Sequence, residues 1–107
     1  GAKSLRGADA GPACVFVFTP APGGAYSRMF AQEYGVVEDP ATGSSTGPLA
    51  AFMMRHGLVR GGSDLRFISE QGVKMGRRSI LHVHAPSAEE IHVGGHVAPL
   101  TEGTFTI

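Results

Sequence analysis

Apolar residues in this chain fall into short runs separated by glycine and proline, a pattern that predicts several short strands. Residues 13–19 form an unbroken run of β-branched, aromatic and small apolar side chains, which predicts a buried strand. The Pro- and Gly-rich stretch 20–24 predicts a turn, and 26–32 a second strand. Four later strands are predicted, each bounded by Gly or Pro clusters, over 65–70, 79–85, 91–98 and 104–107.

One segment departs from this pattern and predicts a helix. Residues 49–54 are all apolar, and the residues before them are small or hydroxylated, so we expect an N-cap between Thr42 and Thr46. Pro48 is then expected in the first turn, where its missing N–H costs nothing. Gly57 suits the C′ position that ends a helix. Because the apolar side chains point in all directions, we expect a helix buried all round, with strands wrapped about it.

These elements predict an α+β fold: a mostly antiparallel sheet or partial barrel wrapped around one central apolar helix. All 107 residues are expected to form a single domain. The predicted strands are too few to close a barrel around a helix, so an edge is left unpaired. We therefore expect self-association, as a two-fold homodimer.

Composition narrows the class of function and the compartment. The formal net charge is zero and the basic residues are scattered, which argues against nucleic acid as a partner. The single cysteine, Cys14, cannot form an internal disulfide and favours a reducing compartment. No apolar run is long enough to span a bilayer, and residues 1–12 read as a loose lead-in without a signal-peptide core. We expect a soluble cytoplasmic protein with no membrane partner.

The start of the predicted helix is a candidate anion site. No acidic residue lies between Ala41 and Met54, so the positive end of the helix dipole is not neutralised locally. Exposed amides, two glycines that allow close approach and hydroxyl donors would suit a small anion. The alternative is a Gly/Ser/Thr loop that caps a core helix and binds nothing.

Five histidines raise the question of a metal site. His82 and His84 share one face of a predicted strand, and His92 and His96 lie on the next. No carboxylate or thiolate stands beside them at ligand spacing, so no metal site is expected.

The other nucleophilic and basic side chains are weaker candidates. Cys14, in an apolar strand, is expected to be an inert core residue, and Ser44 lacks the G-x-S-x-G context of a nucleophilic serine. Lys74, Arg77 and Arg78 are expected to form a solvated basic rim, which could also attract an acidic substrate.

Three sequence blocks resemble the C-terminal part of the PhzF family of phenazine-biosynthesis-like proteins. Their order and spacing both agree with the family, and the first is highly specific; the blocks are 38–44 (EDPATGS), 71–77 (QGVKMGR) and 91–95 (IHVGG). The resemblance runs from about Val15 to the last residue but covers only the last portion of the family. This chain has Arg78 where the family usually has proline, and Ser45 where alanine is common.

The resemblance implies a fold like that of diaminopimelate epimerase and an isomerase that shifts a proton on trans-2,3-dihydro-3-hydroxyanthranilate without cofactor or metal. Asp39 would line the cleft and assist proton handling, while Thr42, Gly43 and Ser44 would hold the substrate carboxylate. The family's glutamate base lies in an N-terminal segment that does not occur here. Two hypotheses follow: a PhzF-like isomerase fragment that needs an N-terminal half or a second copy, or a non-catalytic module that keeps the fold and the carboxylate pocket.

Overall fold

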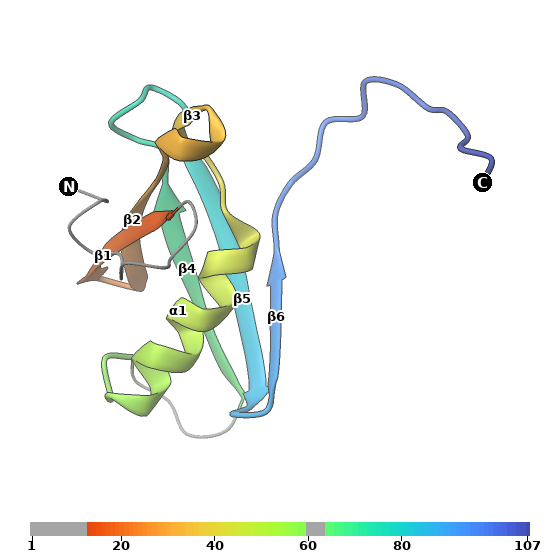
Figure 1. The fold of residues 1–107 in the computed structure, drawn as a ribbon. Coiled ribbons are helices and arrows are strands. Elements are labelled where there is room, and N and C mark those ends of the chain that lie inside the picture. The colour runs from red at the N-terminus through yellow and green to blue at the C-terminus, as the bar shows by residue number, and fades with distance from the viewer. Residues whose placement is uncertain (1–12, 60–63) are drawn as a thin grey trace.

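The computed structural model describes residues 13–59 and 64–107, and shows one helix lying against a curved sheet (Figure 1). The predicted lead-in 1–12 and most of the predicted loop 61–64 lie outside the described residues. In chain order the elements are β1 (Val15–Ala21), β2 (Gly24–Ala31), the 3₁₀ helix η2 (Gln32–Tyr34), β3 (Val36–Asp39), α1 (Gly43–Arg55), β4 (Leu65–Gln71), β5 (Ser79–Ser87) and β6 (Glu90–Gly94).

The sheet has six strands, ordered β1-β2-β4-β5-β6, with β3 paired to β2. All neighbouring pairs are antiparallel except β2 and β4, which are parallel. The predicted α+β class, with a mostly antiparallel sheet around one helix, is therefore confirmed. The turn predicted over 20–24 is also confirmed, because Pro22 and Gly23 close the β1–β2 hairpin and Gly23 has a φ of 79°.

Strand β2 brings two distant parts of the chain together along one of its edges. β1 pairs with the whole length of the other edge. β4 runs parallel to β2 and ends where Gln71 pairs with Ser27, whereas β3 runs antiparallel and ends where Asp39 pairs with Met29. The C-terminal ends of β3 and β4 therefore point toward each other, with Asp39 and Gln71 at the junction.

The core lies between α1 and the concave face of the sheet. Its buried residues are Ala25, Leu49, Ala50, Met53, Leu65, Phe67, Val83 and Ala85. On β4 and β5 they alternate with exposed or half-buried residues, as expected for a sheet that buries one face. Met53, with none of its surface exposed, is the largest fully buried side chain.

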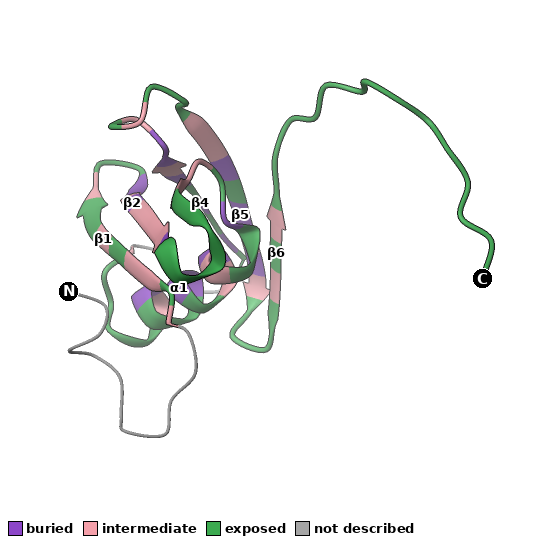
Figure 2. Cartoon of the chain, turned by 45° about the horizontal axis from the view of Figure 1, so that its top comes forward, coloured by how far each residue is buried: buried purple, intermediate pink, exposed green. Residues whose placement is uncertain are grey.

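The expectation of a helix buried all round is wrong. Phe52 is 46% exposed, and Ala51 and Arg55 on the same side are also exposed. The sheet curves past the helix but β1 and β6 do not pair, so the side of α1 that faces this gap meets solvent (Figure 2). The continuous apolar run thus supplies residues to the face of α1 that packs in the core and to the face that is exposed to solvent.

The ends of α1 follow local chemistry, with one correction. The helix begins at Gly43 after the N-cap Thr42, so Pro48 lies in the second turn and not in the first as predicted. At the other end, Gly57 has a φ of 64°. Its N–H donates to the Met54 carbonyl, and the Leu58 N–H donates to the Met53 carbonyl. This is the Schellman arrangement, so the predicted C′ glycine is confirmed.

The C-terminal strand prediction is wrong for 104–107. Residues 95–107 form no strand, and β6 ends at Gly94, short of the predicted 98. The segment extends away from the sheet and is exposed throughout (Figures 1 and 2). Its alternation of apolar and polar residues suits a strand, but among the described residues no neighbouring strand pairs with it. Elements η2 and β3 were not predicted.

Candidate functional site

Thr42 ends the loop that leads into α1, and all its polar groups bond within the protein. Its N–H donates to Gln71 Oε1 over 3.1 Å, and its hydroxyl donates to Asp39 Oδ2 in a very short contact. Its carbonyl accepts hydrogen bonds from the N–H and the hydroxyl of Thr46. Thr42 is 6% exposed. The structure therefore ties Thr42 to the protein's own groups, whereas the sequence predicted a ligand contact.

Asp39 lies at the C-terminal end of β3, half-buried beside the start of the helix. One carboxylate oxygen, Oδ2, accepts the Thr42 hydroxyl, and the backbone carbonyl accepts the side-chain amide of Gln71 over 2.8 Å. Among the described residues, nothing donates a hydrogen bond to Oδ1. One carboxylate oxygen of Asp39 is thus anchored, and the other has no donor among the described residues.

The first turn of α1 presents bare backbone donors. The N–H groups of Gly43, Ser44 and Ser45 precede the first intrahelical hydrogen bond, which Thr46 makes to Thr42, and no described residue accepts from them. Thr42 makes no side-chain cap, and the first turn has no acidic residue. Gly43 and Ser44 are exposed. The premise of an uncapped, positively polarised helix start is therefore confirmed.

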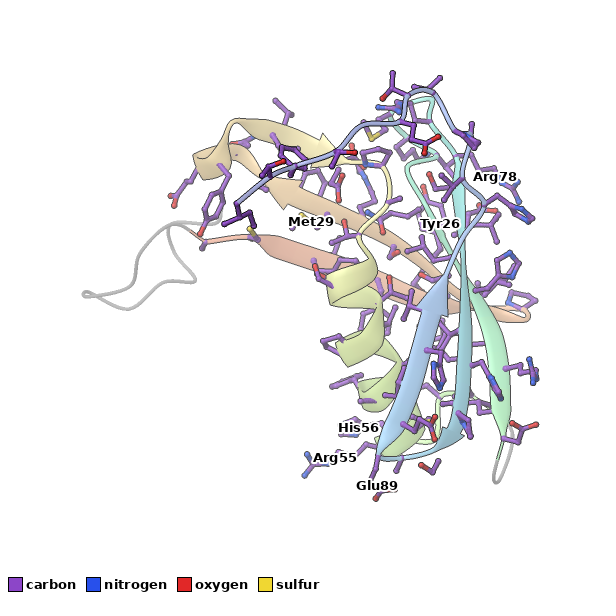
Figure 3. All side chains as sticks on the ribbon, turned by 90° about the vertical axis from the view of Figure 1, so that its right-hand side faces the viewer. Tyr26, Met29, Arg55, His56, Arg78 and Glu89 are labelled. Atoms are coloured by element: carbon purple, nitrogen blue, oxygen red, sulfur yellow. The ribbon has the colours of Figure 1, made fainter. Side chains whose placement is uncertain are left out.

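A cavity of about 490 Å³ opens beside this helix start. It is lined by Ala41 and Gly43 from the first sequence block, by Val93, Gly94 and Gly95 from the third, and by Arg78, Ser79, Ile80, Leu81 and His96. Figure 3 places Arg78 toward the end of the molecule where α1 begins, with Arg55 and His56 at the opposite end of the helix. Segments far apart in sequence thus meet at one cavity, and Gly43 brings the start of α1 to its lining.

Beneath the first turn the protein interior is polar, which sequence analysis missed. The fully buried side chains there are Ser27, Thr46, Ser69 and Gln71. The hydroxyls of Ser27 and Ser69 lie 3.1 Å apart. Gln71 makes three hydrogen bonds to Asp39 and Thr42. The alternation of 65–71 placed Gln71 on the buried face, and a glutamine there is the signal that could have been noticed.

An ion pair flanks the site on the outer side of β3. Arg28 on β2 donates to both carboxylate oxygens of Glu38, over 2.9 and 3.1 Å. The Arg28 hydrogen bond lowers the pKa of Glu38 below its usual range, and Glu38 in turn raises the pKa of Arg28. This fork-to-fork geometry clips β3 to β2 just before Asp39.

Four of the five histidines lie in two pairs, with His82 edge-on to His96 and His84 stacked against His92, while His56 lies against Phe52. His84 also contacts Asp64 at 2.5 Å, which lowers the pKa of that carboxyl. No group of three or more His, Cys, Asp or Glu residues in 13–59 and 64–107 is arranged to hold a metal ion.

The other candidates are placed as follows. Cys14 is exposed, so the expectation of a core cysteine is wrong: β1 begins one residue later, and Cys14 precedes the paired part of the hairpin. Lys74, Arg77 and Arg78 are exposed, as expected of a basic rim, and Arg78 pairs with Glu70 over 2.7 Å. Within the described residues, no helix has the length and apolar character needed to cross a bilayer.

Comparisons with known proteins agree on one group. The profile of the family described as "Phenazine biosynthesis-like protein" matches residues 11–103. The chain is 43% identical over 81 residues to the trans-2,3-dihydro-3-hydroxyanthranilate isomerase of Pseudomonas aeruginosa, covering 72% of this chain and 28% of that protein. For the Pseudomonas fluorescens isomerase the identity is 40% over 85 residues, covering 76% and 30%. An uncharacterized isomerase of Clostridium acetobutylicum is 41% identical over 59 residues, covering 54% and 20%. The chain thus spans between 20% and 30% of the length of these three relatives.

Proposed function

Because this chain belongs to the phenazine biosynthesis-like protein family, we propose that it is the carboxylate-binding part of a PhzF-type isomerase. One observation carries this proposal: the uncapped start of α1 reaches, at Gly43, a cavity that residues of the first and third family blocks line together with Arg78. Three bare amides beside a cavity suit a carboxylate, which accepts several N–H donors at once.

In this proposal the N–H groups of Gly43, Ser44 and Ser45 and the Ser44 hydroxyl bind the carboxylate of a small cyclic substrate. Asp39 assists the proton shift through Oδ1, while its Oδ2 is held by Thr42. Thr42 acts on the ligand indirectly, since its own polar groups are already bonded. The carbon acid requires a base within hydrogen-bond reach, and the glutamate that serves in the family would come from outside this chain. The substrate class is that of trans-2,3-dihydro-3-hydroxyanthranilate, which the relatives' names give.

Ligand binding is testable on the chain itself. We expect 3-hydroxyanthranilate to shift the ¹⁵N–¹H resonances of Gly43, Ser44 and Ser45 more than those of the β4–β5 ladder. The control ligand is 2-aminophenol, which has the same ring without the carboxylate and should leave these three amides unchanged. Equal shifts from both compounds, or none from either, would contradict a carboxylate site.

Catalysis is testable in a chimera in which this chain replaces the matching 85-residue segment of the Pseudomonas fluorescens relative. We expect the chimera to isomerise trans-2,3-dihydro-3-hydroxyanthranilate with deuterium uptake in D₂O. Asp39→Asn should lower kcat by about 10²–10⁴-fold, the usual contribution of a positioned acid or base. Asp64→Asn, the same change at the far end of β4, should lower it little. A folded chimera without turnover would remove the catalytic proposal.

The second hypothesis, a non-catalytic binding module, draws support from the cavity itself. Only two of the residues that line it, Arg78 and His96, are ionisable, and neither is a carboxylate base. On this hypothesis 3-hydroxyanthranilate binds, the chimera is inactive, and Asp39→Asn changes nothing beyond affinity. Turnover that disappears in the Asp39→Asn chimera would exclude it.

A further inference from the structure

Gln71 is fully buried at the C-terminal end of β4, with a polar side chain that faces the loop before α1. Buried amide side chains carry a desolvation cost unless their donors and acceptor are bonded. Here Oε1 accepts the Thr42 N–H over 3.1 Å. Nε2 donates to the Asp39 carbonyl over 2.8 Å and to the Thr42 hydroxyl oxygen over 2.9 Å. A single side chain therefore holds both residues on either side of the Pro40–Ala41 linkage.

The orientation of this amide is fixed by its backbone partners. A backbone N–H can only donate and a backbone carbonyl can only accept, so Oε1 must face Thr42 and Nε2 must face Asp39. In the flipped amide, Nε2–H would face the Thr42 N–H, donor against donor. Oε1 would face the Asp39 carbonyl oxygen, acceptor against acceptor. Because Nε2 also donates to the Thr42 hydroxyl oxygen, the hydroxyl proton must point elsewhere, and it points to Asp39 Oδ2.

This chain of directed hydrogen bonds has a consequence for the candidate acid. Gln71 sets the direction of the Thr42 hydroxyl, and that hydroxyl holds one carboxylate oxygen of Asp39. Oδ1 is then the carboxylate oxygen that accepts no hydrogen bond from the described residues. The same glutamine occupies the Thr42 N–H, so the bare donors begin at Gly43, on the exposed side of the turn.

We propose that Gln71 is a positioning residue for the site described above, and that it sets both which oxygen of Asp39 is free and which amide is the first that a ligand meets. This proposal rests on the proposed function. It gives Gln71 no contact with substrate, because its side chain is fully enclosed and its three hydrogen bonds stay within the protein.

Two substitutions separate the contacts of Gln71. Gln71→Glu keeps an oxygen that can accept from the Thr42 N–H but cannot, when ionised, donate to Asp39 or to the Thr42 hydroxyl. Gln71→Met has a similar shape and loses all three hydrogen bonds. Gln32→Met, an exposed glutamine in η2, is the matched control.

The first readout needs no ligand and uses the whole chain. Hydrogen exchange of the Thr42 N–H should be slow in the natural sequence and in Gln71→Glu, and at least about tenfold faster in Gln71→Met. The N–H groups of Phe67 and Val83, in the β4–β5 ladder, should stay protected in all variants and so report that the sheet is intact. Unchanged Thr42 exchange in Gln71→Met would overturn the proposed Gln71–Thr42 bond, whether or not the chain binds any carboxylate.

The second readout is kinetic and uses the chimera. Misplacing a catalytic group by about 1 Å can cost about 10²-fold in rate, so kcat should fall by that order in both Gln71 variants, with KM changed less than about threefold in Gln71→Glu. Gln32→Met should leave both constants unchanged. If kcat in both Gln71 variants stays within threefold of the unsubstituted chimera, the positioning role is wrong. An inactive unsubstituted chimera would count against the proposed function, and the exchange experiment would still decide the role of Gln71.

Discussion

The conformation of Gly72 allows the loop before α1 and the turn after β4 to pack closely against each other. Its φ is 78°, and a Cβ built there would lie 2.3 Å from the Arg77 carbonyl oxygen and 2.9 Å from the Pro40 carbonyl oxygen. The backbone of Gly72 thus fits between two carbonyls, one from each segment. A side chain at this position would push them apart.

We expect Gly72→Ala to destabilise the protein more than Gly76→Ala does. Gly76 has a similar φ of 75° but open space around it, so alanine there costs only the left-handed conformation, about 1–2 kcal/mol. At Gly72 the overlap with two backbone oxygens adds to that cost. Urea unfolding of the two variants measures the difference, and equal losses of free energy would show that the close approach contributes nothing.

At the scale of single residues, sequence analysis located the loop before α1 but assigned some side chains wrongly. Asp39, Gly43 and Ser44 were identified through the resemblance, and the structure places them at one helix start. Gln71 was noted only as the first residue of the 71–77 block, after the predicted strand 65–70, because a hydrogen-bond partner 29 residues away leaves no trace in local pattern. Cys14 was misplaced because an apolar neighbourhood in sequence does not fix where strand pairing begins.

Strand β3 is the strand that sequence analysis missed, and it positions Asp39. It has only four residues, and its pairing with β2 contains a register shift. Short strands of this kind depend on tertiary contacts more than on propensity. The Arg28–Glu38 pair supplies one such contact, since its two hydrogen bonds join β2 to β3.

The contribution of this pair should depend on pH. The folded state lowers the pKa of Glu38, so the pair stabilises the fold fully above the ordinary pKa of glutamate. That contribution is lost as the pH falls through the lowered pKa of the folded state. We therefore expect Glu38→Gln to be less stable than the natural sequence at pH 7, with the difference shrinking in acid.

Urea unfolding at a series of pH values measures this effect, and added salt should reduce it because the pair is partly exposed. Glu102→Gln, in the exposed C-terminal segment, is the control and should show no pH-dependent difference. A constant gap between Glu38→Gln and the natural sequence at all pH values would exclude the ion pair as its cause.

The helix and most strands were predicted from local pattern, since periodicity and Gly or Pro boundaries are local signals. The extent to which the helix is buried was not predicted correctly. Six apolar residues in a row are compatible with a helix that is enclosed on all sides and with one that is exposed on one side. The case for an anion site therefore loses the support of all-round burial. It retains the bare amides and the membership of the family.

For the whole molecule, the main feature is apolar surface that the described residues leave uncovered. Phe52 on α1 is 46% exposed and contacts Phe18 of β1 edge-on. Val97, Leu100 and Phe105 in the C-terminal segment are 85%, 92% and 98% exposed. Surfaces of this kind usually mark contact with further protein. The open sheet edges at β1 and β6 point the same way.

We expect the isolated chain to self-associate, as a two-fold dimer that covers this surface. Light scattering should give a mass near twice 11.1 kDa at working concentrations. Phe52→Asp should shift the mass toward the monomer if the gap is the contact. Val37→Asp, a comparable change at a 70% exposed site on β3, should not. A monodisperse monomer would contradict the expectation.

The C-terminal ends of β3 and β4 point toward each other along β2, and this arrangement links ligand binding to folding. The residues that shape the candidate site belong to two strands that become neighbours only when a third strand pairs with both. A partly folded chain that has formed α1 but not this junction would carry the amides without the aspartate or the glutamine in place. A small acid whose binding requires the aspartate and the glutamine in place would bind only chains in which β3 and β4 are paired with β2. Its binding would therefore stabilise the fully folded chain over the partly folded one.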